Sequence, residues 1–117
     1  MKKDNVIAEK SFEFALKIIQ LYKKLQLENE FVISKQVLRS GTSIGANIQE
    51  ASAAFSKKDF IHKMSIASKE ARETKYWLRL INKSNLTNIN VDEQLKEVEQ
   101  LINILTKIVK TAQQNLK

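Results

Sequence analysis

The stretch Leu38–Phe55, "LRSGTSIGANIQEASAAF", contains both glycines of the 117-residue chain, Gly41 and Gly45. Small and apolar residues recur through it at alternating steps of four and three, which is the spacing of one helix face. The residues on this face are Val37, Gly41, Ile44, Ile48, Ala51 and Phe55. The pattern predicts one helix through both glycines, over about residues 29–55, with Asn29 as its N-cap.

A glycine inside a helix costs about 1 kcal/mol relative to alanine, so two of them call for a compensating gain in packing. The Gly-x-x-x-Gly spacing, with Ser43 nearby, allows a second backbone to approach closely. The alternative is a phosphate-binding loop, which needs a preceding strand and a Lys followed by Ser or Thr. Ala46 and Asn47 stand at those positions instead, so a packing surface is the favoured interpretation.

The rest of the chain predicts three more helices, over about residues 4–26, 57–82 and 91–115. Ser56 with Asp59, and Asn90 with Glu93, have the spacing of capping boxes at the last two helix starts. The chain has no proline and is rich in good helix formers. We therefore expect an all-α protein, with residues 1–117 forming a single antiparallel up-and-down four-helix bundle.

The apolar faces of the first and last predicted helices are wider than a bundle seam requires. The extra apolar residues either remain on the surface for self-association or fill the core of the bundle. The pattern alone does not distinguish these two interpretations.

The composition argues against most catalytic and metal chemistry. There is no cysteine, and His62 is the only histidine, so nucleophilic triads and thiolate sites have no basis. A di-iron bundle needs Glu-x-x-His on two helices, and Asp59-x-x-His62 is a lone partial match. We expect no enzyme activity, metal or cofactor. Charged residues interrupt every long apolar run, so we expect neither a signal peptide nor a membrane span, and a cytoplasmic location.

Polar residues on the second and third predicted helices fall on lines that face each other if these helices pack side by side. A hydrogen-bonding network between the helices is one interpretation, and a solvated surface is the other. The residues concerned are Ser43, Asn47 and Glu50 on the second helix, and Glu70, Glu73 and Trp77 on the third.

Twenty basic and thirteen acidic residues give the chain a net charge of +7. Residues 56–84 hold eight Lys or Arg and three Asp or Glu, a local charge of +5. Within them, alternating steps of four and three define a line that we call the basic line. It consists of Lys58, His62, Ser65, Lys69, Arg72, Tyr76, Arg79 and Lys83.

Cations along a helix can follow a phosphate backbone, and Tyr76 or His62 can stack on an unpaired base. The basic line therefore predicts nucleic-acid binding, led by Lys69, Arg72 and Arg79 with Tyr76. The alternative is a solvated face with pairs such as Lys69 and Glu73.

The segment "LRSGTSIGANIQEASAAFSKKDFIHKMSIASKEARETKYWLRLI", residues 38–81, closely resembles a family of bacterial four-helix bundle proteins. These S23-like proteins were first noticed in intervening sequences of 23S ribosomal RNA genes, and the accessory variability proteins of diversity-generating retroelements share their fold. "SIGANIQEA" and "KEARETKYWLRLI" carry the most specific similarity. The family's small-residue motif falls on Ser43, Ile44, Asn47, Ile48 and Glu50, and its acid in the third helix on Glu73.

The resemblance implies a ring-like homopentamer with a basic surface. For the retroelement relatives it also implies binding to nucleic acid and to a reverse transcriptase, whereas most members have no established biochemical activity. Many relatives have a glycine where Ala51 and Ser52 stand, which suggests that the second helix extends further here before it bends. Two functions follow as hypotheses: a basic, homo-oligomeric accessory protein that binds RNA or DNA, or a protein-interaction scaffold that binds neither.

Overall fold

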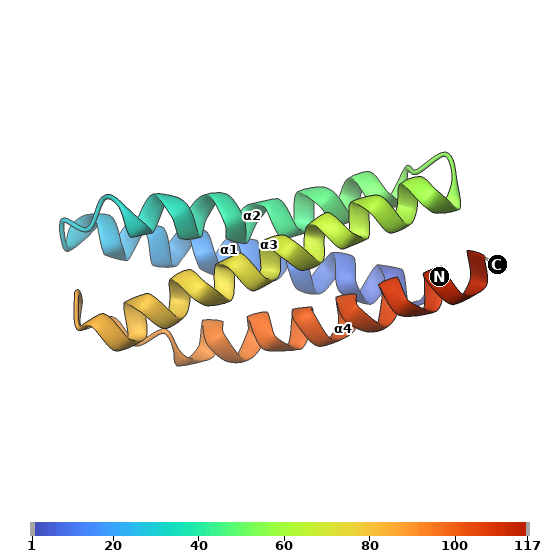
Figure 1. The fold of residues 1–117 in the computed structure, drawn as a ribbon. Coiled ribbons are helices and arrows are strands. Elements are labelled where there is room, and N and C mark those ends of the chain that lie inside the picture. The colour runs from blue at the N-terminus through green and yellow to red at the C-terminus, as the bar shows by residue number, and fades with distance from the viewer. Residues whose placement is uncertain (1, 117) are drawn as a thin grey trace.

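The computed structural model describes residues 2–116, with side chains from residue 6 onward. Four helices follow one another: α1 (Lys2–Leu27), α2 (Ile33–Ser52), α3 (Lys57–Ser84) and α4 (Asp92–Leu116). Successive helices run in opposite directions and α4 returns beside α1, which closes an elongated bundle of 49 × 21 × 21 Å (Figure 1). The expected all-α four-helix bundle is confirmed.

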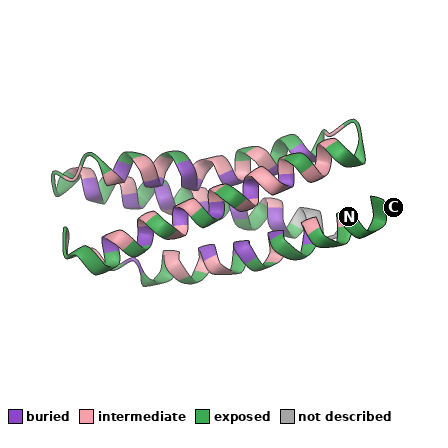
Figure 2. Ribbon diagram, in the orientation of Figure 1, coloured by how far each residue is buried: buried purple, intermediate pink, exposed green. Residues whose placement is uncertain are grey.

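Each helix turns one apolar stripe toward the bundle axis, where the buried residues of all four helices meet (Figure 2). The stripe of α2 includes Val37, Ile44 and Ile48, as its four-and-three spacing predicts. Both glycines lie on the side of α2 that faces α1, with Gly41 against Ile18 and Gly45 against Ser11. The two glycines of α2 thus form part of the contact between α1 and α2.

The wide apolar faces of α1 and α4 differ in how far they are buried. On α4, Leu101 and Ile108 are buried and Ile104 packs against the core, so the width of this face fills the interior. On α1, Val6 and Leu27 near its two ends are exposed, and so are three further large apolar residues that lie close together on the side opposite the core. They are Phe12, Leu16 and Ile19, and we call them the α1 apolar stripe.

The turn between α1 and α2 differs from the prediction that Asn29 caps the second helix. Asn29 has a left-handed backbone (φ 62°) and ends α1. Its N–H donates to the Gln26 carbonyl (3.0 Å) and that of Glu30 to the Leu25 carbonyl (2.9 Å), the Schellman pattern of a helix C-terminus. The prediction was wrong because asparagine suits both helix ends, and the sequence does not say which helix it serves.

Helix α2 begins at Ile33, four residues later than expected, and the carboxylate of Glu30 bonds to three N–H groups at its start. That carboxylate accepts from the N–H groups of Val32, Ile33 and Ser34 at 3.2, 3.1 and 2.6 Å. A carboxylate here is also favoured by the helix dipole.

Helix α2 ends at Ser52, three residues before the predicted end at Phe55. The N–H groups of Ala53 and Ala54 bond to carbonyls three residues back (both 3.1 Å), which tightens and closes the last turn. Ser56 then caps α3 by accepting from the Asp59 N–H (3.0 Å), as predicted. At α4, Asn90 Oδ1 accepts from the Asp92 N–H (2.8 Å).

Candidate functional site

The basic line lies along the outer face of α3, because the opposite face of this helix carries the buried residues Met64, Ala67, Ala71 and Leu78. Seven of its eight members are exposed, and Ser65 is half-buried. The exposed members are Lys58, His62, Lys69, Arg72, Tyr76, Arg79 and Lys83. A single helix therefore presents all the residues that were predicted to contact nucleic acid on one surface.

Ion pairing separates these cations from Lys63 and Lys75 of the same helix. Lys63 pairs with Glu50 of α2 (2.8 Å), and Lys75 pairs with Glu99 of α4 (2.5 Å). Among the described side chains, none of the five Lys or Arg residues of the basic line forms an ion pair. The basic line thus keeps its positive charge uncompensated at contact distance.

The alternative pairing of Lys69 with Glu73 does not occur, because Glu73 is engaged on the side of α3 that faces α2. Its carboxylate pairs with Arg39 and also accepts a hydrogen bond from the Trp77 indole N–H (3.0 Å). The adjacent Glu70 pairs with Arg39 (3.2 Å) and accepts from the Ser43 hydroxyl (2.6 Å). These five residues form a polar cluster across α2 and α3.

Arg39 is the member of the polar cluster that the sequence reasoning missed. It stands four residues before Ser43, so the line through Ser43 and Asn47 extends back to it. This four-residue spacing is the sequence signal that places Arg39 beside Ser43. Arg39 joins two carboxylates that would otherwise repel each other, which makes the polar cluster a structural feature and no candidate acid–base pair.

Asn47 and Glu50 do not join the polar cluster. Asn47 donates to the carbonyl of Ser43 in its own helix (2.9 Å), and the Glu50 carboxylate is exposed and paired with Lys63. The antiparallel register explains this outcome, because Ser43 faces Glu70 and Glu50 faces Lys63. Helix α3 therefore presents a cation to Glu50, where the sequence reasoning had placed carboxylates or the indole.

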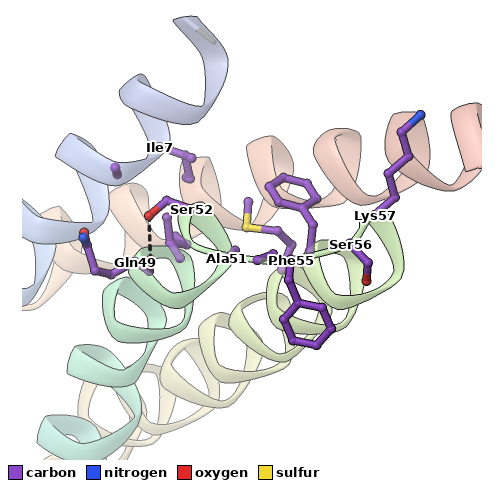
Figure 3. A pocket seen from close by; sticks show the side chains of 12 residues that line it. Ile7, Gln49, Ala51, Ser52, Phe55, Ser56 and Lys57 are labelled. Atoms are coloured by element: carbon purple, nitrogen blue, oxygen red, sulfur yellow. Dashed lines mark hydrogen bonds between the residues drawn. The ribbon is translucent and has the colours of Figure 1, made fainter.

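A hollow of about 730 Å³ lies at the end of the bundle, beneath the bend between α2 and α3 (Figure 3). Apolar side chains such as Ile7, Phe60 and Met64 line it, and Phe55 at its rim is 92% exposed. The Ser52 hydroxyl at its edge donates to the Gln49 carbonyl (2.6 Å). Among the described side chains, its lining includes no carboxylate or histidine, and Lys57 is its one ionisable group, so it holds no acid–base pair.

Two further features bear on function. Over residues 2–116, no helix is long and apolar enough to cross a membrane. Among the side chains of residues 6–116, His, Asp and Glu nowhere gather in the groups of three or more that could hold a metal ion.

Comparison with known proteins identifies the family. The family model described as "23S rRNA-intervening sequence protein" matches residues 3–110. The chain belongs to this family. No curated protein matches it in sequence.

The chain is also similar to a protein of solved structure from Bacteroides thetaiotaomicron VPI-5482, described as a protein with unknown function from the S23 ribosomal protein family. The two are 49% identical, and the match covers 92% of this chain and 98% of that one with a TM-score of 0.87. This family is not associated with an enzymatic activity in either comparison. The fold and the family thus agree with the resemblance found in residues 38–81.

Proposed function

We propose that this member of the 23S rRNA-intervening sequence protein family is a cytoplasmic, non-enzymatic homo-oligomer that binds the backbone of RNA or DNA through the basic line of α3. The observation that carries the proposal is the pairing pattern: among the side chains of residues 6–116, five exposed cations share one face without a carboxylate partner, whereas Lys63 and Lys75 on other faces are neutralised. Unpaired cations in a row attract phosphates and release the counterions condensed on them.

Geometry supports contact along the length of α3. Lys58 and Lys83 are separated by 25 residues of continuous helix, which at about 1.5 Å per residue extends over roughly 38 Å. Tyr76, 54% exposed between Arg72 and Arg79, offers a ring for stacking on an unpaired base. Backbone contacts without a groove-reading element favour binding with little sequence preference.

The test is a titration of RNA and DNA binding against salt, with two charge-matched variants. K69Q/R72Q removes two cations of the basic line, and K63Q/K75Q removes two paired cations from the same helix. We expect K69Q/R72Q to lower affinity and to reduce the slope of log affinity against log salt by about 0.7 to 0.9 per lost contact. The control variant should keep the wild-type slope. Binding that is independent of salt, or equal losses in both variants, would contradict the proposal.

A protein-interaction scaffold is the second candidate, favoured by the α1 apolar stripe. Phe12 is 66% and Leu16 50% exposed on the side of α1 opposite the core, where a partner can cover them. The same surface can serve the self-association, as a ring of five, that the family resemblance implies. The scaffold becomes the better explanation if the wild-type protein binds neither RNA nor DNA at low salt.

Light scattering tests self-association directly. The wild-type mass should be a multiple of the 13.5 kDa chain, and F12Q/L16Q should reduce it. V32Q, at a 73% exposed position in the turn after α1, is the matched control and should leave the mass unchanged. A wild-type mass of one chain would exclude the oligomer.

A further inference from the structure

A groove of about 270 Å³ runs between α3 and α4, on the flank of the basic line. Three residues of α3 and four of α4 line it, and the sequence analysis did not predict that these residues form a site. They are Ser65, Ser68 and Arg72 from α3, and Thr106, Val109, Lys110 and Gln113 from α4.

The lining of this groove is suited to an anion. Two cations, the hydroxyl groups of Ser65 and Ser68 and the Gln113 amide can donate hydrogen bonds into it, and Val109 is the one apolar residue among the described lining. No carboxylate is among the lining residues that the structure describes, so none of these residues repels a phosphate. Ser65 and Arg72 also belong to the basic line, so the groove continues that surface onto α4.

Arg72 is held in place across the groove. Its Nη2 donates to Thr106 Oγ1 of α4 (3.3 Å), and the Thr106 hydroxyl in turn donates to the Ile102 carbonyl (2.7 Å). The guanidinium has five N–H donors, and this contact uses one of them. The remaining planar fork matches two oxygens of a phosphate, and its restrained position reduces the ordering cost of binding.

We infer that this groove is a seat for one phosphate of a nucleic-acid backbone, with Arg72 and Lys110 supplying the charge and Ser65 and Ser68 supplying neutral donors. This inference rests on the proposed function and deepens it. The interface extends from the outer face of α3 onto α4, and Lys110 becomes a contact that the basic line does not include. Thr106 is a positioning residue, since it acts through Arg72.

The decisive comparison is K110Q against K107Q, tested with a short single-stranded oligonucleotide. Both lysines are exposed on α4 and carry the same charge, but only Lys110 lines the groove. One lost phosphate contact should reduce the salt slope by about 0.7 and the affinity by about fivefold at 0.1 M salt. K107Q should behave as wild type. T106V, which removes the hydroxyl that holds Arg72, should lower affinity while leaving the net charge unchanged.

The outcomes separate the seat from the proposed function. If K110Q and T106V bind as tightly as K107Q while K69Q/R72Q still loses affinity, the seat is overturned and the proposed function stands. If the wild type binds no oligonucleotide, the proposed function fails. The groove is then tested by adding inorganic phosphate and measuring the changes in backbone amide chemical shifts by NMR. Shifts confined to the groove, absent in K110Q, support a seat for free phosphate, and the absence of such shifts overturns it.

Discussion

Gly41 of α2 lies directly against Ile18 of α1, so that a Cβ atom on Gly41 would stand 2.9 Å from Cγ2 and 3.0 Å from Cγ1 of Ile18. Ile18 is fully buried, and its Cγ atoms branch directly from its own Cβ, so they cannot swing away without moving the core. At Gly45 the equivalent Cβ would stand 3.4 Å from the Ser11 hydroxyl, which is ordinary contact. The two glycines therefore differ in how much space they leave.

This difference predicts opposite effects for two identical substitutions. G45A should stabilise the protein by about 0.5 to 1 kcal/mol, because alanine is the better helix former and the space accepts it. G41A should be less stable than G45A by about 1 to 3 kcal/mol, because overpacking against Ile18 outweighs the same helix gain. Urea unfolding measures both free energies, and equal effects at the two positions would contradict the close contact at Gly41.

The helices were predictable because apolar periodicity depends only on neighbours within the same helix. The spacing from Val37 to Ala51 defines the buried face of α2 whatever packs against it, and the basic line defines an outer face of α3 for the same reason. The position of α2 along α3 was not predictable, since it depends on how two helices slide against each other. Glu50 therefore meets Lys63, and the partner of Glu73 is Arg39.

The groove between α3 and α4 was not predicted from the sequence for a related reason. Lys110 shares one face of α4 with Thr106 and Gln113, but these neighbours are uncharged and form no line of cations like that of α3. The second cation of the groove, Arg72, comes from another helix. A residue that gains its role from a second helix gives no periodic signal of its own.

Arg39 should couple energetically to Glu73 across the two helices. A double-mutant cycle of R39Q and E73Q should give a coupling free energy of about 0.5 to 1 kcal/mol, the upper part of the range for exposed ion pairs, because Arg39 bridges two carboxylates. Trp77 is the chain's one tryptophan and donates to Glu73, so its fluorescence should shift in both single variants. K75Q removes a cation from the opposite flank of α3 and is the control. A coupling of zero would show that the pair is accidental.

Asn29 provides a test of which helix end it serves. At a left-handed position after α1, glycine is accommodated better than any residue with a side chain, so N29G should match or exceed the wild type in stability. N29S should be less stable by about 1 kcal/mol, because serine adopts the left-handed region poorly. An N-cap would give the reverse order, with serine tolerated and glycine slightly worse. Thermal or urea unfolding of the two variants distinguishes these orders.

The ion pairs of Lys17 predict the pH dependence of stability. Lys17 of α1 contacts Glu93 (2.7 Å) and Glu97 (2.5 Å) of α4, and these hydrogen bonds raise the pKa of Lys17 while Lys17 lowers the pKa of Glu93. Because the Glu93 pKa is lower in the folded state, its contribution is complete above the unfolded value of about 4.3 and is lost as pH falls through the folded value. For Lys17 the sign is opposite: its contribution is complete below about pH 10.4 and is lost as pH rises through the raised folded value.

The wild type should therefore melt at a higher temperature than K17Q by a constant margin between about pH 6 and pH 9. That margin should shrink below about pH 4, as Glu93 takes up a proton and the pair is lost. K23Q removes an exposed cation of α1 that forms no ion pair among the described side chains, so its difference from the wild type should lack this acid-dependent step. Differential scanning calorimetry across this range measures the margin. A K17Q margin that stays constant down to pH 3 would show that Lys17 does not hold Glu93 in its charged form.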